Sequence, residues 1–315
     1  MCTAASLKGK VHCFGRNLDL ERSYNESVVM TPRNSCFPMR CTDDLTSHYA
    51  MIGMATVVQD IPLYYEATNE KGLSMAGLNF PGNACYQKCS DEKINVASFE
   101  LIVWILGKCS TVAEAKALLD QTQIVDVSFS EQFPSSPLHW MISDKNESIV
   151  VECVEEGVKI YDNPWNVLTN NPPFDYHLMN MHAYMHLHEA GSVNSLDASV
   201  NLQNISLGFG ALGLPGDYSS ASRFVRACFV KSKLILTDSK EDTINQFFHL
   251  LNAVSMPKGC VLCPNGEYEY TRYSCCCTDD GLYTYTTYHN SVKRSVDMKS
   301  YDLNGQMIIS HPLED

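Results

Sequence analysis

The chain has 315 residues, of which 45% are hydrophobic, and a formal net charge of −13. This length suits one large domain or two ordinary ones, and the apolar content is sufficient for a hydrophobic core. So acidic a chain is a poor partner for nucleic acid or for an anionic membrane surface, which excludes both as expected partners. An anionic substrate would have to be attracted by local arginine side chains against the overall field.

The sequence contains neither a run of eighteen apolar residues nor the basic-then-apolar layout of a secretion signal. We therefore expect a cytoplasmic protein with no membrane segment. Fourteen cysteines are scattered along the chain. In a long chain without an export signal, they are expected to be reduced thiols rather than a disulfide framework.

The N-terminal stretch carries the strongest chemical signal. Cys2 follows an initiator methionine, and removal of a methionine before a small residue would leave a cysteine with a free α-amine. The ordinary pKa of that amine is about 7.7–8.0 and that of the thiol about 8.5, so one residue could supply nucleophile and base. Arg16 and Asp19 follow a predicted short strand over residues 10–14 and could fix the charges of this terminus. The alternative is an ordinary cysteine behind an initiator methionine.

The first half of the chain mixes strand and helix patterns. Its predicted elements are buried strands at 49–58 and 73–78, a buried helix at 96–106 and an amphipathic helix that begins with a capping box at 110–114. The buried helix is expected to close at Gly107, because glycine ends many helices. Pro81 and Gly82 force a turn after the second strand.

The second half predicts antiparallel hairpins and two further helices. The predicted strands are 138–143, 148–154, 158–161, 268–277 and 282–288, and the predicted helices are 222–234 and 242–254. Strands and helices in separate runs favour a layered α+β domain. Since no linker, repeat or low-complexity tract occurs, residues 1–315 are interpreted as a single domain.

Two other patterns offer alternatives. The segment Gly72-Leu73-Ser74-Met75-Ala76 approaches the elbow of serine hydrolases, but a predicted strand runs through the place of the sharp turn. A non-enzymatic zinc or redox module is the rival from another class, although neighbouring residues of a strand point to opposite faces. It would be built on Cys260, Cys263, Cys275, Cys276 and Cys277.

Six motifs occur in order along the chain and together resemble one enzyme family. They are Cys2-Thr3, Phe14-Gly15-Arg16-Asn17-Leu18-Asp19, Asn69-Glu70-Lys71-Gly72-Leu73-Ser74-Met75-Ala76-Gly77-Leu78-Asn79-Phe80-Pro81, Leu138-His139-Trp140-Met141-Ile142-Ser143-Asp144, Leu168-Thr169-Asn170-Asn171-Pro172, and Leu214-Pro215-Gly216-Asp217 with Ala221-Ser222-Arg223-Phe224. Over essentially its whole length the chain is similar to the choloylglycine hydrolase family, which contains bile salt hydrolases and penicillin V acylases. The resemblance implies the fold of the N-terminal nucleophile hydrolases, an α+β, four-layer αββα sandwich.

The resemblance also implies a catalytic set and no metal or organic cofactor. Cys2 would be the nucleophile and its α-amine the proton carrier, Arg16 and Asp19 would fix amine and thiol, Asn79 and Asn170 would complete the oxyanion site, and Arg223 would be a further site residue. These residue types suit the chemistry, because amide cleavage passes through an oxyanion that a neutral amide donor can stabilise. Arg16 cannot deprotonate, so beside Cys2 it should favour the thiolate.

Substrate class follows from the same resemblance. Asn79 favours a bile salt hydrolase, because this position tends to be asparagine in those enzymes and tyrosine in many penicillin V acylases. The steroid would lie against Leu18, Tyr64, Phe129, Phe133 and Leu138. Aromatic residues at both 129 and 133 depart from the typical pattern and could narrow the pocket. We therefore expect a linear amide C–N hydrolase that cleaves glycine- or taurine-conjugated bile salts, with penicillin V acylase as the alternative. The resemblance further suggests a homotetramer.

Overall fold

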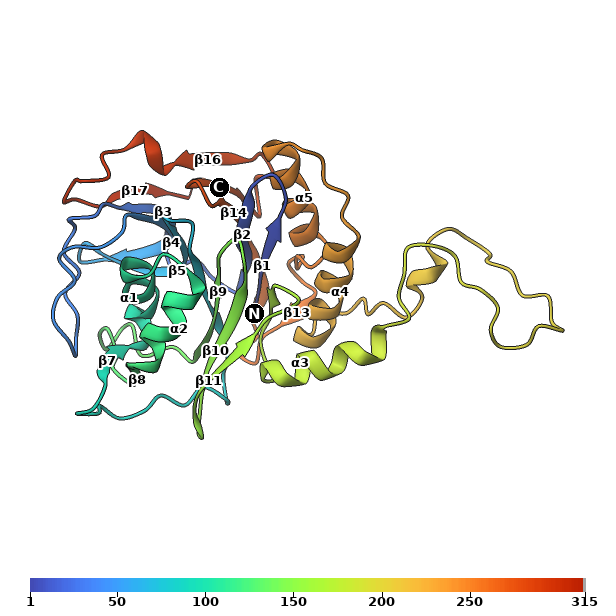
Figure 1. The fold of residues 1–315 in the computed structure, drawn as a ribbon, viewed down its shortest axis with the longest axis horizontal. Coiled ribbons are helices and arrows are strands. Elements are labelled where there is room, and N and C mark those ends of the chain that lie inside the picture. The colour runs from blue at the N-terminus through green and yellow to red at the C-terminus, as the bar shows by residue number, and fades with distance from the viewer. Residues whose placement is uncertain (314–315) are drawn as a thin grey trace.

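Two large antiparallel sheets lie face to face in the computed structural model, which describes residues 1–313 (Figure 1). The first sheet has the order β12 (Val167–Leu168), β1 (Cys2–Lys8), β2 (His12–Leu20), β14 (Tyr268–Thr278), β15 (Leu282–Thr287) and β16 (Arg294–Asp297), with β13 (Val261–Leu262) beside β14. The second has the order β11 (Gly157–Asp162), β10 (Ser148–Val154), β9 (Leu138–Ser143), β6 (Ser74–Asn79), β5 (Ile61–Asn69), β4 (Met51–Val58), β3 (Glu26–Thr31) and β17 (Ile309–Pro312). A separate parallel pair consists of β7 (Ile94–Ala97) and β8 (Thr122–Val125).

Helices cover the outer face of each sheet. On the second sheet lie α1 (Leu101–Lys108) and α2 (Val112–Asp120), and on the first lie α3 (Phe174–Asn180), α4 (Ser220–Lys233) and α5 (Lys240–Asn252) (Figure 1). Short 3-10 turns occur at Ser98–Glu100, Met181–Tyr184, Phe209–Ala211 and Met298–Ser300. The succession of helices, sheet, sheet and helices confirms the predicted αββα sandwich.

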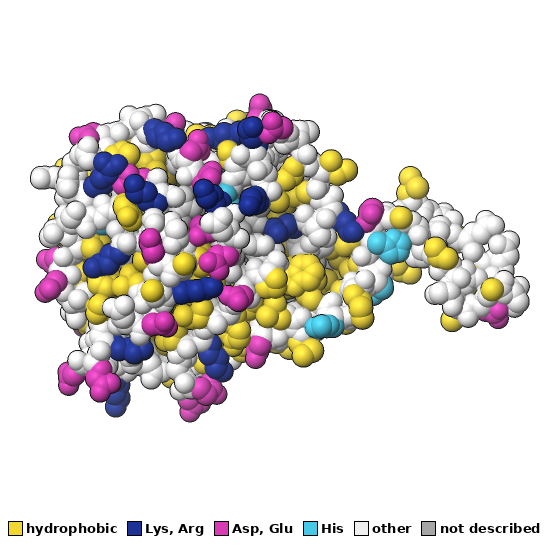
Figure 2. Space-filling view, in the orientation of Figure 1, with side chains coloured by type: hydrophobic (Ala, Val, Ile, Leu, Met, Phe, Trp, Pro, Cys, Tyr) yellow, Lys and Arg dark blue, Asp and Glu magenta, His cyan; other side chains and the backbone are white. Residues whose placement is uncertain are grey.

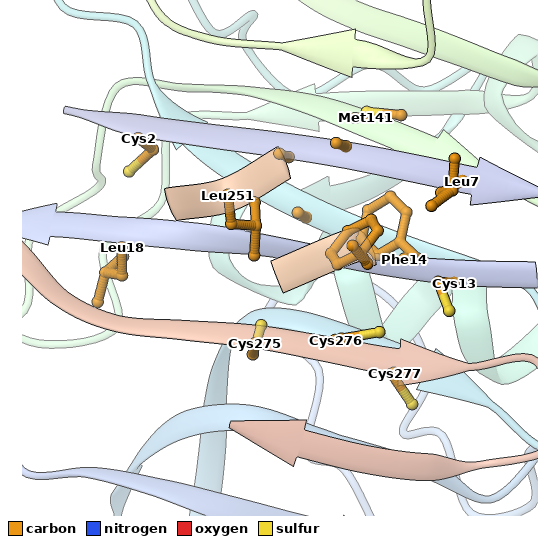
Figure 3. Close-up of a cluster of buried hydrophobic side chains, with 14 of the residues drawn as sticks. Cys2, Leu7, Cys13, Phe14, Leu18, Met141, Leu251, Cys275, Cys276 and Cys277 are labelled. Atoms are coloured by element: carbon orange, nitrogen blue, oxygen red, sulfur yellow. The ribbon is translucent and has the colours of Figure 1, made fainter. Parts of the chain in front are cut away.

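The core is divided between the layers by the alternation of strand side chains. On β9, Met141 points into a cluster that joins the two sheets and α4 and α5, whereas the next residue, Ile142, points into a second cluster under α1 and α2. Figure 3 shows the first cluster, in which Cys2 and Leu18 lie near one another on neighbouring strands. The second sheet is therefore apolar on both faces, as a sheet between two other layers must be.

Most of the predicted segments are confirmed. The strand predictions at 49–58 and 73–78 correspond to β4 and β6, and the predicted hairpins correspond to β9, β10 and β11 and to β14 and β15. The helices predicted at 222–234 and 242–254 correspond to α4 and α5, each starting two residues earlier. Their N-caps are Ser219 and Ser239, whose side chains accept backbone hydrogen bonds from Ser222 and Asp242.

One wrong prediction concerns the strand that carries the site. The short strand predicted at 10–14 is the start of β2, which continues to Leu20, so Arg16 and Asp19 lie within the strand and do not follow it. Pairing explains the extension, because β1 lies along one edge of β2 and β14 along the other. The alternation of the strand then decides which of its side chains face the second sheet.

The helix predicted at 96–106 was also partly wrong. Its first residues form β7, because β8 supplies a parallel partner 28 positions later, with Ile94 opposite Thr122. Gly107 lies inside α1 and does not end it. A methyl group at Gly107 would come within 2.9 Å of Leu45 and 3.0 Å of His48. Close packing therefore explains this glycine, and a helix cap does not.

A long segment, residues 185–216, leaves the body between Tyr184 and α4. We call it the arm (Figure 1). Its apolar side chains have little to pack against, and Figure 2 shows several of them on its surface. The most exposed are Met185, Val193, Leu196, Ile205, Leu207 and Leu212. Within residues 1–313 there is no helix with the length and apolar character needed to cross a membrane.

Candidate active site

Cys2 begins β1 and is almost completely buried, with 2% of its surface exposed. It lies opposite Leu18 in the pairing of β1 with β2. Its backbone N–H donates a hydrogen bond of 2.7 Å to Oδ1 of Asn170. The chain as described retains Met1, whose amine donates to the carbonyl oxygen of Asp19 at 2.9 Å and pairs with Glu269. Burial lowers the pKa of this amine below its ordinary value.

Arg223, on α4, ties three site residues together. Its Nη1 atom donates to the carbonyl oxygen of Cys2 and to Oγ1 of Thr3, both at 2.6 Å, and its Nη2 atom donates to Oδ1 of Asn170 at 2.9 Å. The side chain is fully buried, and this burial lowers the pKa of its guanidinium. Because a buried cation needs charged or polar partners, Arg223 fixes the start of β1 relative to α4.

Asn170 connects this cluster to Asn79. Its Oδ1 atom accepts from Cys2 and Arg223, and its Nδ2 atom donates to the carbonyl oxygen of Asn79 at 2.7 Å. The backbone of Asn170 is held in turn by the hydroxyl of Ser220 and by the ring of His177. Asn79 itself ends β6 and lines the pocket described below.

Asp19 is buried with one oxygen satisfied and one free. Its Oδ1 atom accepts a 2.6 Å hydrogen bond from the hydroxyl of Thr271 on β14. Its Oδ2 atom has no hydrogen-bond partner among the described residues and lies 4.0 Å from Nη1 of Arg223. A buried carboxylate oxygen without a donor is unfavourable, so this atom is available for a cation that approaches from the side of Cys2.

Arg16 lies on the other side of Cys2, between the two sheets. Its Nη1 atom donates to the carbonyl oxygens of Gly77 at 2.7 Å and Tyr65 at 3.1 Å, and lies 3.8 Å from Oε2 of Glu66. Burial acts to lower the pKa of Arg16, but nearby Cys2, Tyr273 and Glu66 act in the opposite direction and leave it raised. Arg16 is therefore a permanent positive charge beside the thiol.

Glu66 was missed by the sequence analysis. It is buried, and it accepts hydrogen bonds from the hydroxyl groups of Tyr273 at 2.8 Å and Tyr283 at 2.7 Å. Burial raises the pKa of its carboxyl group. Glu66 thus connects Arg16 to β14 and β15. No local pattern in the sequence marks it, because the two tyrosines that bind it lie more than 200 residues away.

A cavity of about 370 Å³ opens beside these groups, a volume typical of small-molecule sites. It brings together Cys2, Arg16 and Asn79 with the five predicted substrate-binding residues. Those five are Leu18, Tyr64, Phe129, Phe133 and Leu138. The rings of Phe129 and Phe133 meet edge to face at 6.3 Å, and the hydroxyl of Tyr64 is held by Thr31 at 2.7 Å, so this wall of the pocket is closely packed and mainly apolar.

The same cavity has lining residues that the sequence analysis did not name. They include Leu20, Arg22, Tyr24, Thr56, Leu63, Tyr65, Phe99 and Gln132. A signal for some of them was present, since Leu20 follows Leu18 at the two-residue period of a strand. Asp19, Asn170 and Arg223 do not line the cavity. Asn170 and Arg223 form hydrogen bonds with the backbone of Cys2, and Asp19 lies 4.0 Å from Arg223.

The cysteines of the rival zinc or redox interpretation are spread over different environments. Cys275, Cys276 and Cys277 are buried on β14, whereas Cys260 is exposed and Cys263 is half-buried near β13. Cys275 donates to Glu66 at 3.4 Å. Within residues 1–313 there is no group of three or more histidine, cysteine, aspartate or glutamate side chains arranged to hold a metal ion.

Comparison with known proteins agrees with the geometry. Residues 2–311 match the family model described as linear amide C–N hydrolases, choloylglycine hydrolase family. A bile salt hydrolase/transferase of Lactiplantibacillus plantarum is 49% identical over 99% of this chain and 97% of its own, and one of Clostridium perfringens is 39% identical over 98% and 95%.

Solved structures give the same result. A variant of the conjugated bile acid hydrolase of Clostridium perfringens has a TM-score of 0.92 and 37% identity, covering 100% of this chain and 97% of its own. Penicillin V acylase of Agrobacterium tumefaciens has a TM-score of 0.77 at 19% identity, covering 98% and 90%, which is a likeness of fold. The protein therefore belongs to the choloylglycine hydrolase family of linear amide C–N hydrolases.

Proposed function

We propose that the protein is a bile salt hydrolase, which cleaves the amide between a cholate-like acyl group and glycine or taurine. The observation that carries this proposal is the position of Cys2 on the wall of an apolar pocket, with its backbone nitrogen held on Asn170. Relatives at 49% and 39% identity bear the name bile salt hydrolase/transferase. The thiol-rich rival module is set aside, because family membership makes the chain an amide hydrolase.

In this mechanism Cys2 becomes the N-terminal residue once Met1 has been removed. Its nitrogen would then be an amine held near Oδ1 of Asn170. The unpartnered Oδ2 atom of Asp19 lies 4.0 Å from Nη1 of Arg223, which binds the carbonyl oxygen of Cys2. The amine takes the thiol proton and becomes an ammonium that both oxygens stabilise. Arg16 favours the thiolate by its permanent charge.

The thiolate attacks the amide carbon and forms a tetrahedral oxyanion. We assign the oxyanion donor to the side-chain amide of Asn79, which lies on the pocket wall. Asn170 acts as the residue that fixes it, because its Nδ2 atom already donates to the carbonyl oxygen of Asn79. The C–N bond then breaks as the ammonium gives its proton to the leaving nitrogen. Water attacks the thioester, with the amine as base, and releases the bile acid and the thiol.

No metal or organic cofactor takes part in these steps. The pocket supplies binding energy for a rigid apolar acyl group, at about 25 cal/mol for each Å² of apolar area removed from water. Part of this binding energy can be used to stabilise the transition state. A steroid offers several times more apolar surface than the phenoxyacetyl group of penicillin V, which favours bile salts as the substrate.

The test is side-by-side kinetics of the mature protein. Glycine- and taurine-conjugated cholate and penicillin V are compared by the release of amino acid or of 6-aminopenicillanic acid. We expect a much higher kcat/KM for the bile salts. Equal or better turnover of penicillin V would make the protein a penicillin V acylase of the same family and would remove the weight placed on Asn79.

We also propose that the protein is a cytoplasmic homotetramer whose chain forms a single domain. The support for assembly is the arm, whose side chains of Leu196, Ile205 and Leu207 are 87%, 88% and 102% exposed. Apolar side chains on a projecting segment are typical of a protein–protein contact. Native mass spectrometry tests the proposal, and the double variant Leu196→Asp, Ile205→Asp should then give smaller species.

A further inference from the structure

Two cationic side chains, those of Arg16 and Arg22, line the pocket. Among the described residues that line it there is no aspartate or glutamate, although the chain carries a net charge of −13. Arg16 is fully buried and its Nη1 atom is held by two carbonyl oxygens. Arg22 is exposed, and the mechanism proposed above does not use it.

Tyr24 holds the guanidinium of Arg22 in place but does not use all of its hydrogen-bond donors. Its Nε and Nη2 atoms donate to the hydroxyl of Tyr24 at 3.2 and 3.1 Å, and its guanidinium lies 5.1 Å from the centre of that ring. Tyr24 is held in turn, because its carbonyl oxygen accepts from Thr56 at 3.0 Å, and Thr56 pairs with the hydroxyl of Tyr65 at 2.8 Å. A guanidinium has five N–H donors. Three therefore have no acceptor among the described residues.

Arg22 lies at the exposed rim of the pocket, whereas Cys2 is almost completely buried in its wall. Leu18 lies directly opposite Cys2, and Leu18, Leu20 and Arg22 all line the cavity. The two residues from Leu18 to Leu20, where β2 ends, span about 7 Å. The chain then bends at Glu21 and Arg22, so the exposed Arg22 lies beyond the end of the strand that carries Leu18.

The acyl group, rather than the leaving amino acid, occupies this end. The cavity beside Cys2 is lined mainly by apolar and aromatic side chains, among them Leu18, Leu20, Leu63 and Phe129. A rigid apolar acyl group therefore fills the cavity, which extends from Cys2 to Arg22.

We propose that Arg22 is a specificity residue that binds an oxygen substituent on the acyl group, at the end remote from the scissile amide. A hydroxyl would accept one hydrogen bond, and a sulfate ester would accept two from the planar guanidinium with its opposite charge. The favoured substrates are thus conjugated bile salts with a sulfate on the ring farthest from the side chain. This inference rests on the proposed function, because it takes the steroid as the acyl group.

The experiment compares two substrates that differ only at that ring carbon, hydroxyl in one and sulfate ester in the other. Mature wild type and Arg22→Met are assayed with both, each as its glycine and its taurine conjugate. We expect Arg22→Met to lower kcat/KM by about 10- to 100-fold for the sulfated substrate and by less than about threefold for the hydroxylated one. Arg22→Lys should recover part of the loss.

Two further variants separate a local effect from a change of net charge. Lys159→Met removes one exposed positive charge on β11, away from the pocket lining, and should leave the sulfate-to-hydroxyl ratio unchanged. Tyr24→Phe removes the hydroxyl that anchors Arg22 and should lower the ratio by a smaller factor than Arg22→Met.

The outcomes distinguish this inference from the proposed function. If wild type cleaves the hydroxylated conjugates and Arg22→Met lowers both substrates equally, or changes only the glycine-to-taurine ratio, the assignment of Arg22 is wrong while the proposed function stands. If mature wild type cleaves neither conjugate, the proposed function itself is wrong and the inference falls with it.

Discussion

The Oδ2 atom of Asp19 lies 4.0 Å from Nη1 of Arg223, and both side chains are completely buried. The geometry is close enough for strong attraction in a poorly solvated site, but within residues 1–313 no group donates a hydrogen bond to that oxygen. The Nη1 atom of Arg223 donates instead to the carbonyl oxygen of Cys2 and to the hydroxyl of Thr3. The free oxygen of Asp19 is thus kept for a second cation, which we assign to the ammonium of processed Cys2.

This relationship predicts the behaviour of Asp19→Asn. The amide keeps the shape and can still accept from Thr271, but it removes the charge that stabilises the ammonium. We expect kcat to fall by about 100-fold or more, as for the loss of a proton-transfer group. Thr271→Val, which removes the hydrogen bond and keeps the charge, should lose much less. Near-normal turnover of Asp19→Asn, with an unchanged circular dichroism spectrum, would contradict the assigned role.

Removal of Met1 is the second prediction. In the described chain the nitrogen of Cys2 is an amide that donates to Asn170, and an amide nitrogen cannot accept the thiol proton. A chain that retains Met1 should therefore be inactive. The measurement is intact mass and N-terminal sequencing of active protein, with retention of Met1 enforced by inhibiting methionine aminopeptidase during expression. Full turnover from the unprocessed chain would overturn the mechanism.

The third prediction is that Cys2→Ser folds normally and loses nearly all turnover. The exchange barely changes side-chain volume, and a hydroxyl is a far poorer nucleophile at neutral pH than a partly ionised thiol. Ser74 cannot substitute, because it is 1% exposed and its hydroxyl is paired with Thr68 at 2.8 Å. Thermal unfolding and amide hydrolysis are measured on the same preparation. Activity within a few-fold of wild type would mean that the nucleophile lies elsewhere.

The sequence was sufficient for the catalytic motif but not for the groups that hold it. Cys2, Arg16 and Asp19 lie within twenty residues, and the pairing of β1 with β2 keeps them together. Thr271, which bonds Asp19, is 252 positions away, and it reaches the site only through the pairing of β14 with β2. Long-range pairing of this kind leaves no local signal.

The predicted boundaries of the first helix were wrong for a related reason. Residues 94–97 have a composition that suits a helix or a strand, and the parallel partner at residues 122–125 decides the outcome. Glycine favours helix ends, so the sequence predicts a helix end at Gly107. The close approach of Leu45 and His48 explains instead why a glycine stands there. In both cases tertiary contacts overrode a local preference.

The last prediction concerns acid stability and rests on His12. This ring is 4% exposed, its Nε2 atom lies 3.2 Å from Oγ of Ser143, and its Nδ1 atom has no hydrogen-bond partner among the described residues. Burial lowers its pKa to about 4, although the carboxylates of Asp279 and Asp144 act in the opposite direction.

In the unfolded chain His12 takes up a proton near its ordinary pKa of about 6.5, whereas in the folded protein it stays neutral down to about pH 4. The unfolded state therefore binds more protons in this window, and the free energy of unfolding falls as the pH is lowered through it. The loss from this one group reaches about 3 kcal/mol near pH 4.

Replacing His12 by glutamine should accordingly flatten the acid side of the stability profile. Urea unfolding at pH 7 and pH 4.5 measures the difference in free energy for wild type and His12→Gln, and the variant should lose less stability between the two conditions. His249→Gln is the matched control, because His249 is exposed on α5 and should leave the difference unchanged. An equal loss in wild type and His12→Gln would show that the pKa of His12 is the same in the folded and the unfolded protein.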